Sequence, residues 1–281
     1  MARYIDFHVH PPIAEYLDGA FGPYTGALEA VFGREFPRLS IDEIADVYRS
    51  DDGVAVLLGW DAETATGLPP VGSEDIADMV AGREDVFIGF GAVDPLKTDA
   101  VDQVHRAADL GLRGLKLHPS AQHFSPGDAA ILPVFEAASS RGLICLFHTG
   151  YTGLGAGMRG GGGIENQFAN PIHLDTLAAR LPDLQIVAAH PSWPWQAEAI
   201  AVAQHKPNVW LELSGWSPRY MEPQLLEAVR RQFQDRTLFG TDYPFITPQQ
   251  WISAWRGLDP EPGTELTRKV LHDNAARLLG L

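Results

Sequence analysis

The sequence predicts an α/β protein with the architecture of a (β/α)8 barrel, also called a TIM-like barrel. Eight short apolar runs recur along the chain, and most are separated by stretches whose apolar residues repeat at helical spacing. Such runs of Val, Ile, Leu and Phe are typical of parallel strands covered by helices. The 281 residues suit one such barrel, which needs about 250 residues plus loop insertions. An open, doubly wound sheet is the alternative. The runs occupy residues 4–10, 54–60, 86–93, 112–118, 143–148, 184–190, 209–213 and 237–242.

Helix signals fill the intervals between these runs. Ser40 and Glu43 have the spacing of a capping box, in which each side chain bonds to the other residue's backbone N–H. Gly111 and Gly142 stand where two helices are expected to end. No repeat or linker divides the chain, so residues 1–281 are expected to form one domain. Helical spacing extends over residues 99–110, 128–140, 171–181, 194–205 and 223–233.

The charge balance limits the classes of partner. The 21 Lys and Arg residues against 36 Asp and Glu give a net charge of −15, and so acidic a chain disfavours nucleic acid as a partner. A small-molecule substrate is expected instead. No apolar run approaches the roughly 18 residues of a membrane span, and no signal segment is evident, so no membrane partner is expected. A single cysteine, Cys145, lies in an apolar run and is expected to be a buried packing residue. We expect a cytoplasmic protein, which could form a homo-oligomer.

Two connections are longer than turns require. Residues 11–39 follow the first predicted strand and residues 149–170 follow the fifth. Both begin at the C-terminal ends of strands, where barrel enzymes build their sites, so we expect lids or binding loops. The second loop contains the glycine-rich segment 155–163. That segment could also be a surface excursion or a phosphate cradle, although no P-loop lysine pattern accompanies it.

The histidines are concentrated at strand ends. Five of the ten histidines fall at or just inside the C-terminal end of a predicted strand, and an aspartate ends the eighth. In a closed barrel these ends form one ring, so residues far apart in sequence converge on one face. The residues concerned are His8, His10, His118, His148, His190 and Asp242.

The spacing in the first strand predicts a chelate. Residues 6, 8 and 10 share one face of a regular strand, and polar side chains are costly against the outer helix layer. His8 and His10 should therefore point into the barrel, where two imidazoles can bind a borderline cation. His148 and Asp242 can complete a set of three nitrogens and one carboxylate. The alternative is a barrel with polar strand ends and no ion.

The sequence segments around these residues also resemble those of a known family. The chain is similar to the amidohydrolase-related, metal-dependent family that includes aminocarboxymuconate-semialdehyde decarboxylase and its relatives. That resemblance implies an amidohydrolase-type barrel holding one divalent ion, commonly zinc and sometimes manganese, with His8, His10, His148 and Asp242 as ligands. It also implies that His190 is an acid/base that does not bind the metal. The matching segments are Ile-Asp-Phe-His-Val-His-Pro (5–11), Gly-Leu-Lys-Leu-His-Pro (114–119), Phe-His-Thr-Gly (147–150), Ala-His-Pro-Ser (189–192), Leu-Phe-Gly-Thr-Asp-Tyr-Pro (238–244) and Asn-Ala-Ala-Arg-Leu-Leu-Gly-Leu (274–281).

Further residues are candidates for binding the substrate. Lys116 is expected to point inward in phase with His118 and to bind a carboxylate or carbonyl oxygen. It could instead neutralise a buried acid. In other amidohydrolases a carboxylated lysine on this strand bridges two metals, and His190 would then bind the second ion. Arg159 could meet a phosphate or carboxylate, and Trp193 could line an apolar pocket.

Two polar residues near these strand ends have open roles. Glu212 could point inward as a partner for Lys116 or for a ligand histidine, or outward into solvent. Asp6 is a candidate acceptor behind the ligands.

Three functions remain open at this point. The first is a hydrolase acting at a carbonyl centre of a small carboxylate or acyl-thioester, because the glycine-rich loop resembles that of small relatives that hydrolyse β-ketoacyl-CoA. The second is a non-oxidative decarboxylase, a lyase, acting on an aromatic or muconate-like acid. The third is a catalytically silent metal-binding barrel, against which the complete ligand set argues.

Overall fold

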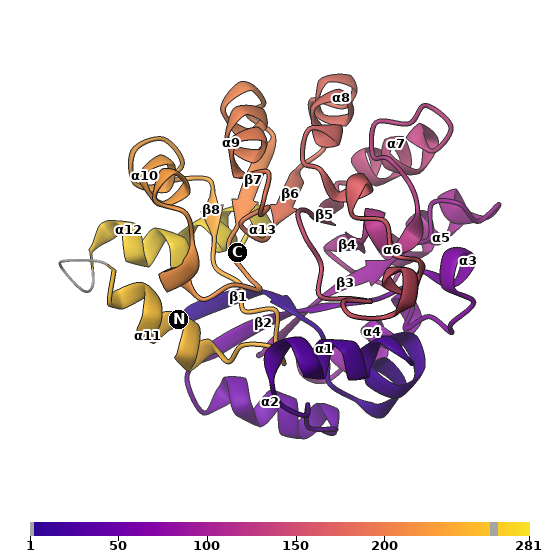
Figure 1. Cartoon of the computed structure of the whole chain (residues 1–281), viewed down its shortest axis with the longest axis horizontal. Helices are drawn as coiled ribbons and strands as arrows, with labels where there is room; N and C mark the ends of the chain where they lie inside the picture. Colours follow the sequence, from indigo (N-terminus) through magenta and orange to yellow (C-terminus); the bar gives the residue numbers. More distant parts are fainter. Residues whose placement is uncertain (1–2, 259–263) are drawn as a thin grey trace.

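The computed structural model describes residues 3–258 and 264–281, and it confirms the predicted barrel. Eight strands form one parallel sheet in their sequence order. In Figure 1 they lie around the centre of the molecule and the helices surround them. The strands are β1 (Tyr4–Val9), β2 (Gly53–Leu58), β3 (Phe87–Ala92), β4 (Gly114–Leu117), β5 (Ile144–His148), β6 (Ile186–Ala189), β7 (Val209–Glu212) and β8 (Thr237–Leu238).

The helices match most of the predicted segments. They are α1 (Tyr24–Phe32), α2 (Ile41–Arg49), α3 (Glu63–Thr66), α4 (Ser73–Val80), α5 (Ala100–Asp109), α6 (Pro119–Gln122), α7 (Leu132–Ser140), α8 (His173–Arg180), α9 (Gln196–His205), α10 (Pro223–Arg231), α11 (Pro248–Arg256), α12 (Glu265–Arg268) and α13 (Asn274–Leu279). Shorter helical turns span Glu15–Ala20, Arg159–Gly163, Asn166–Ala169, Pro218–Tyr220 and Lys269–Asp273. Among the described residues no helix combines the length and apolar character needed to cross a membrane.

The predicted helix ends are confirmed, with one correction. The Ser40 hydroxyl accepts from the Glu43 N–H at 3.3 Å, and the Glu43 carboxylate accepts from the Ser40 N–H at 2.8 Å. Gly111 (φ 80°) and Gly142 (φ 67°) follow α5 and α7 in the left-handed region. The helix predicted over 128–140 begins only at Leu132. A proline is tolerated in the first turn of a helix but clashes further inside, so Pro133 sets this later start.

The barrel closes between β1 and β8 through a short seam. The backbone N–H of Phe7 donates to the Phe239 carbonyl at 3.0 Å, and the N–H of Asp242 donates to the His8 carbonyl at 2.9 Å. The strand predicted over 237–242 ends at Leu238. Asp242 adopts a φ of 63°, which lies outside the strand region and turns the chain out of the sheet.

A bulge in β1 changes which side chains face inward. The register of β1 against β2 shifts between Asp6 and Val9. Asp6 precedes this shift, and its side chain faces the layer between the barrel and the surrounding helices. There its carboxylate accepts a hydrogen bond from the Tyr48 hydroxyl of α2 at 2.8 Å. The expectation that residues 6, 8 and 10 share one face is therefore wrong for Asp6. An irregularity of this kind inserts an extra residue and reverses the alternation.

The floor of the barrel interior is apolar. Phe7, Phe90 and Leu146 pack inside it, and Ala275 and Leu279 of α13 belong to the same buried cluster. A larger apolar layer fills the space between the strands and the outer helices. Cys145 belongs to that layer and is fully buried, as predicted.

Candidate metal centre

The predicted ring of polar residues forms at the carboxyl ends of the strands. His148 is the last residue of β5, and His10, His118 and His190 each directly follow a strand. All four line one cavity together with Asp242. His190 and Asp242 have positive φ values of 73° and 63°, which is uncommon for residues other than glycine. The backbone therefore leaves the sheet sharply at two positions of the site.

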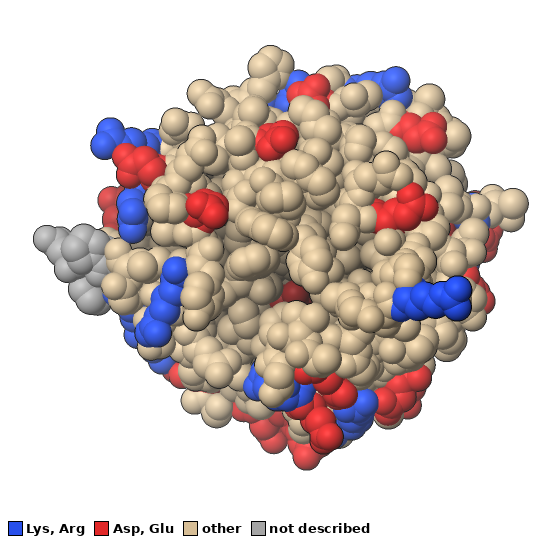
Figure 2. Space-filling model, in the orientation of Figure 1, with Lys and Arg blue, Asp and Glu red and all other residues tan. Residues whose placement is uncertain are grey.

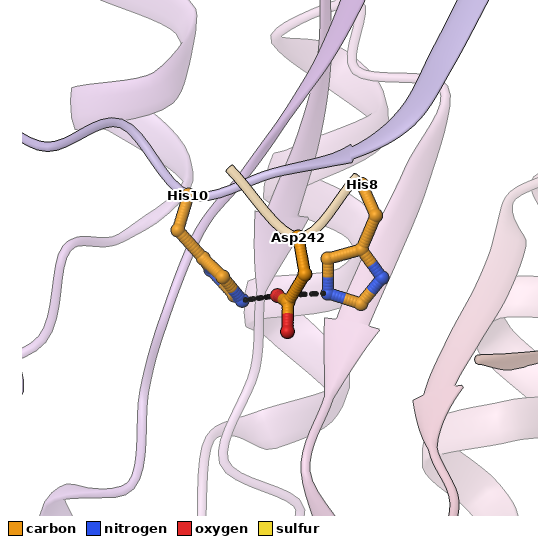
Figure 3. Close-up of side chains that lie close together, drawn as sticks. All are labelled: His8, His10 and Asp242. Carbon is orange, nitrogen blue, oxygen red and sulfur yellow. Dashed lines mark ion pairs between the residues drawn. The ribbon is translucent and has the colours of Figure 1, made fainter. Parts of the chain in front are cut away.

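Three side chains converge most closely. The Asp242 Oδ1 atom lies 3.3 Å from His8 Nε2 and 3.2 Å from His10 Nε2. Figure 3 shows the two imidazoles on either side of the carboxylate, His8 from β1 and His10 from the segment that directly follows it. Within residues 3–258 and 264–281, these atoms form one of two groups that could hold an ion, since all of them lie within 4.8 Å of one another.

Polar partners behind the rings hold both imidazoles in place. The Tyr16 hydroxyl lies 2.7 Å from His10 Nδ1 and also donates to the Gly59 carbonyl at 3.4 Å. His8 Nδ1 lies 3.1 Å from Glu212 Oε2, and that carboxyl also accepts from Ser214. Both Nδ1 atoms therefore have polar partners on the far side from Asp242, and both Nε2 atoms face its carboxylate. Partners of this kind orient the histidine ligands of metal ions.

The group fits a divalent cation. Two imidazole nitrogens and a carboxylate oxygen face one another, and Asp242 Oδ1 is buried without a hydrogen-bond partner. Imidazole nitrogens and carboxylate oxygens are common ligands of divalent ions. Burial also lowers the pKa of both His8 and His10, which favours the neutral rings that bind metals.

His148 lies near this group but outside it. Its Nε2 atom is buried and has no partner, and the residue lines the cavity. The His148 ring stacks on His118 at 3.9 Å between centroids and lies 4.6 Å from the ring of His190. The unpartnered nitrogen is available to an ion or a substrate atom.

A second group lies behind His8 and involves a residue that the sequence did not indicate. The Ser214 hydroxyl donates to Glu212 Oε2 at 2.8 Å and lies 2.9 Å from His190 Nδ1 and 3.1 Å from His8 Nδ1. Glu212 is fully buried, so of its two expected orientations the inward one is correct. Burial raises the pKa of Glu212, and the bonds from Ser214 oppose that shift. Burial lowers the pKa of His190 to about 4, so its ring is neutral at pH 7.

Lys116 points inward, as expected. Its ammonium group lies 3.0 Å from His8 Nε2, and the residue lines the cavity. Burial lowers its pKa to about 8, while the charges of Asp242 and Glu212 oppose that shift. The same side chain is thus close both to the convergent group and to the cavity.

The cavity above these residues has a volume of about 460 Å³. Figure 2 shows it as a hollow in this face, with an acidic side chain at its bottom and uncharged side chains around its mouth. The two long loops meet beside it, because the Tyr24 hydroxyl donates to the Gly162 carbonyl at 2.7 Å. Leu28 and Val31 of α1 and Leu154 of the second loop line the cavity.

Two expected substrate residues lie elsewhere. Arg159 is exposed and does not line the cavity, because its segment of the glycine-rich loop lies at the surface. Trp193 is 43% exposed and packs at the rim, with its ring 5.9 Å from Tyr151 and 6.1 Å from Trp216. Tyr151 and Trp216 line the cavity themselves. The position of Trp216 just after the seventh strand indicates this rim from the sequence, whereas no pattern distinguishes Tyr151 from an ordinary loop residue.

The fold and the site define a barrel with a histidine and carboxylate centre at its carboxyl face. A family model described as amidohydrolase matches residues 5–281, and the chain belongs to that family. Over 89 residues it is 33% identical to the protein fluG of Emericella nidulans, a match that covers 30% of this chain and 10% of fluG. The match therefore spans about a tenth of the length of that curated relative.

Solved structures share the barrel over nearly the whole chain. An uncharacterized TIM-barrel protein from Bordetella bronchiseptica has a TM-score of 0.78 at 24% identity, covering 99% of this chain and 98% of that one. A 5-carboxyvanillate decarboxylase from Novosphingobium aromaticivorans, complexed with manganese and 4-hydroxy-3-methoxy-5-nitrobenzoic acid, has a TM-score of 0.69 at 18% identity. That match covers 100% of this chain and 96% of the decarboxylase. A probable 2-pyrone-4,6-dicarboxylic acid hydrolase from Acinetobacter baumannii has a TM-score of 0.69 at 14% identity, and the match covers 99% of each chain. At these identities the likeness shows the fold.

Proposed function

We propose that this chain is a metal-dependent hydrolase that acts at the carbonyl centre of a small carboxylate substrate. The observation that carries the proposal is the convergence of two imidazole nitrogens and a carboxylate oxygen beside a cavity. The proposed ligands of one divalent ion, zinc or manganese, are His8, His10, His148 and Asp242. When bound, such an ion polarises a carbonyl oxygen and lowers the pKa of water.

The chain's own residues supply the other parts of the reaction. The Ser214 carbonyl lies 3.2 Å from His190 Nδ1 and can only accept, so Nδ1 carries the proton and Nε2 is free to take up another. His190 is therefore the proposed acid/base, which acts on water or on the leaving group. Lys116, the buried cation beside the ligands, is proposed to bind the substrate's carboxylate. The apolar cavity walls exclude bulk water around these groups.

Decarboxylation is the second candidate, and the aromatic walls of the cavity favour it. The rings of Phe21 and Trp60 lie 4.8 Å apart in an edge arrangement, and both residues line the cavity. The similarity to a 5-carboxyvanillate decarboxylase supports the same reaction. In this version His190 would deliver the proton that replaces CO₂. A thioester substrate has less support, because Arg159 does not line the cavity.

The test combines metal analysis with an assay of products. The purified protein is expected to carry about one divalent ion per chain, and a chelator should abolish turnover. Carboxylate-bearing esters and lactones should then be hydrolysed by the metal-loaded protein. Release of CO₂ from aromatic acids without any hydrolysis would reject the hydrolase proposal in favour of the decarboxylase. Bound metal with neither activity, across both sets of compounds, would leave a silent barrel.

A further inference from the structure

The charges that line the cavity are all at one end. Among the described residues that line it, Lys116 is the only lysine or arginine and Asp242 is the only acid. Both belong to the deep end, since each lies within 3.3 Å of the buried His8. An anionic group of a ligand thus finds a cationic side chain at the deep end alone.

The middle of the cavity is a preformed apolar wall. Phe32 stacks on Phe245 at 5.0 Å between ring centroids, and the ring of Phe21 packs edge-on against Trp60. All four residues line the cavity. A carboxylate placed against this wall would lose its hydration without gaining a partner, which is unfavourable.

The apolar character continues to the mouth. Val31, Tyr151 and Tyr220 line the cavity and are 48%, 37% and 75% exposed. Single exposed apolar residues are ordinary, but residues that share the mouth of one cavity are typical of binding sites. Figure 2 shows that charged side chains lie farther out on this face.

We propose that the substrate is anionic at one end only and carries an uncharged apolar body that extends along the aromatic wall toward Val31. The inference rests on the proposed function in taking this cavity as the substrate site. It disfavours acids whose carboxylates lie at opposite ends. It also disfavours coenzyme A esters, whose phosphates would reach a mouth that has no lining lysine or arginine.

Two ligands of nearly equal size test the proposal by calorimetry, without any turnover. They are 4-butylbenzoate and 4-(3-carboxypropyl)benzoate, which differ in whether the far end is a methyl or a carboxylate group. The monoacid is expected to bind the metal-loaded protein at least about tenfold more tightly, because only the diacid buries an unpaired charge. Equal or tighter binding of the diacid would overturn the proposal.

A gain-of-function variant makes the test independent of folding defects. Val31→Lys places a cation at the half-exposed mouth and should tighten diacid binding about tenfold, whereas the monoacid, whose apolar body points toward this position, should not bind more tightly. Val31→Met is the matched uncharged control and should leave the preference intact. Failure of Val31→Lys to improve diacid binding would also reject the proposal. If the preference holds but neither hydrolysis nor CO₂ release is found, the proposed function fails, and the inference then describes a ligand of this cavity and not a substrate.

Discussion

The hydroxyl of Ser214 lies 2.9 Å from Nδ1 of His190, and the carbonyl of the same serine lies 3.2 Å from that nitrogen. The serine therefore contacts the proposed acid/base twice, and it also contacts the Glu212 carboxyl twice, through its backbone N–H and its hydroxyl. One residue thereby fixes the tautomer of His190 and connects it to the partner of His8.

Ser214→Ala removes the hydroxyl contact and keeps the carbonyl contact. We expect kcat to fall about 2- to 10-fold, the equivalent of one hydrogen bond of roughly 0.5–1.5 kcal/mol, with KM unchanged. Steady-state kinetics separate the two constants. A purely structural serine would lower the melting temperature and leave kcat per folded molecule at the wild-type value.

His190→Asn removes the proposed acid/base while keeping a polar side chain of moderate size. Turnover should fall about 10²- to 10⁴-fold, the usual share of general acid–base catalysis. Metal content, measured by mass spectrometry, should stay at the wild-type level. Loss of one metal per chain would instead support a binuclear centre with a carboxylated Lys116.

The double variant His8→Ala, His10→Ala removes both imidazoles that converge on Asp242. Metal bound per chain is expected to fall below about a tenth of the wild-type value, because the chelate is lost. Full occupancy in this variant would contradict the ligand assignment. Circular dichroism provides the control that the barrel still folds.

Gly215→Ala tests how closely the backbone approaches the site. A Cβ at Gly215 (φ 74°) would lie 2.8 Å from His190 Nδ1 and 3.1 Å from Asp242 Oδ2. Gly157 (φ 76°) is a matched control, since a Cβ there meets nothing within 4 Å. Both variants should lose about 1–2 kcal/mol of stability, because alanine disfavours this conformation. Only Gly215→Ala should also lose activity, and equal activity of the two variants would contradict the site.

Cys145 offers a probe of unfolding. Its thiol is buried between β5 and the outer helices, and burial raises its pKa. A thiol reagent should label the native protein at the rate of global unfolding. Labelling should therefore accelerate in denaturant in parallel with the loss of circular dichroism. Rapid labelling of the native protein would show that this layer opens locally.

The sequence predicts the ring of site residues well because strand ends converge whatever the details of each strand. His10, His118, His148 and His190 needed only the strand order to be brought together. The orientation of Asp6 could not be predicted, because the bulge that follows it has no signature in the apolar pattern. The alternation of inward and outward side chains also did not decide which way the Glu212 side chain points, because its strand is so short.

The positions of loop residues could not be predicted from the periodicity of apolar residues. Tyr16 lies in the first long loop and contacts His10 only through the folded path of that loop. Arg159 was a candidate on charge alone, and its loop places it at the surface. Ser214 follows Glu212 by two residues, and that spacing could have indicated it once Glu212 was known to point inward.

The seam between β1 and β8 also bears on when the protein can acquire its ion during synthesis. His8 and His10 are made with the first strand, whereas Asp242 follows the last, and backbone hydrogen bonds join these two segments only when the barrel closes. A chain still emerging from the ribosome has the proposed imidazole ligands of β1 but not the carboxylate. Selective metal uptake would therefore be among the last events in the maturation of this protein, after closure of the barrel.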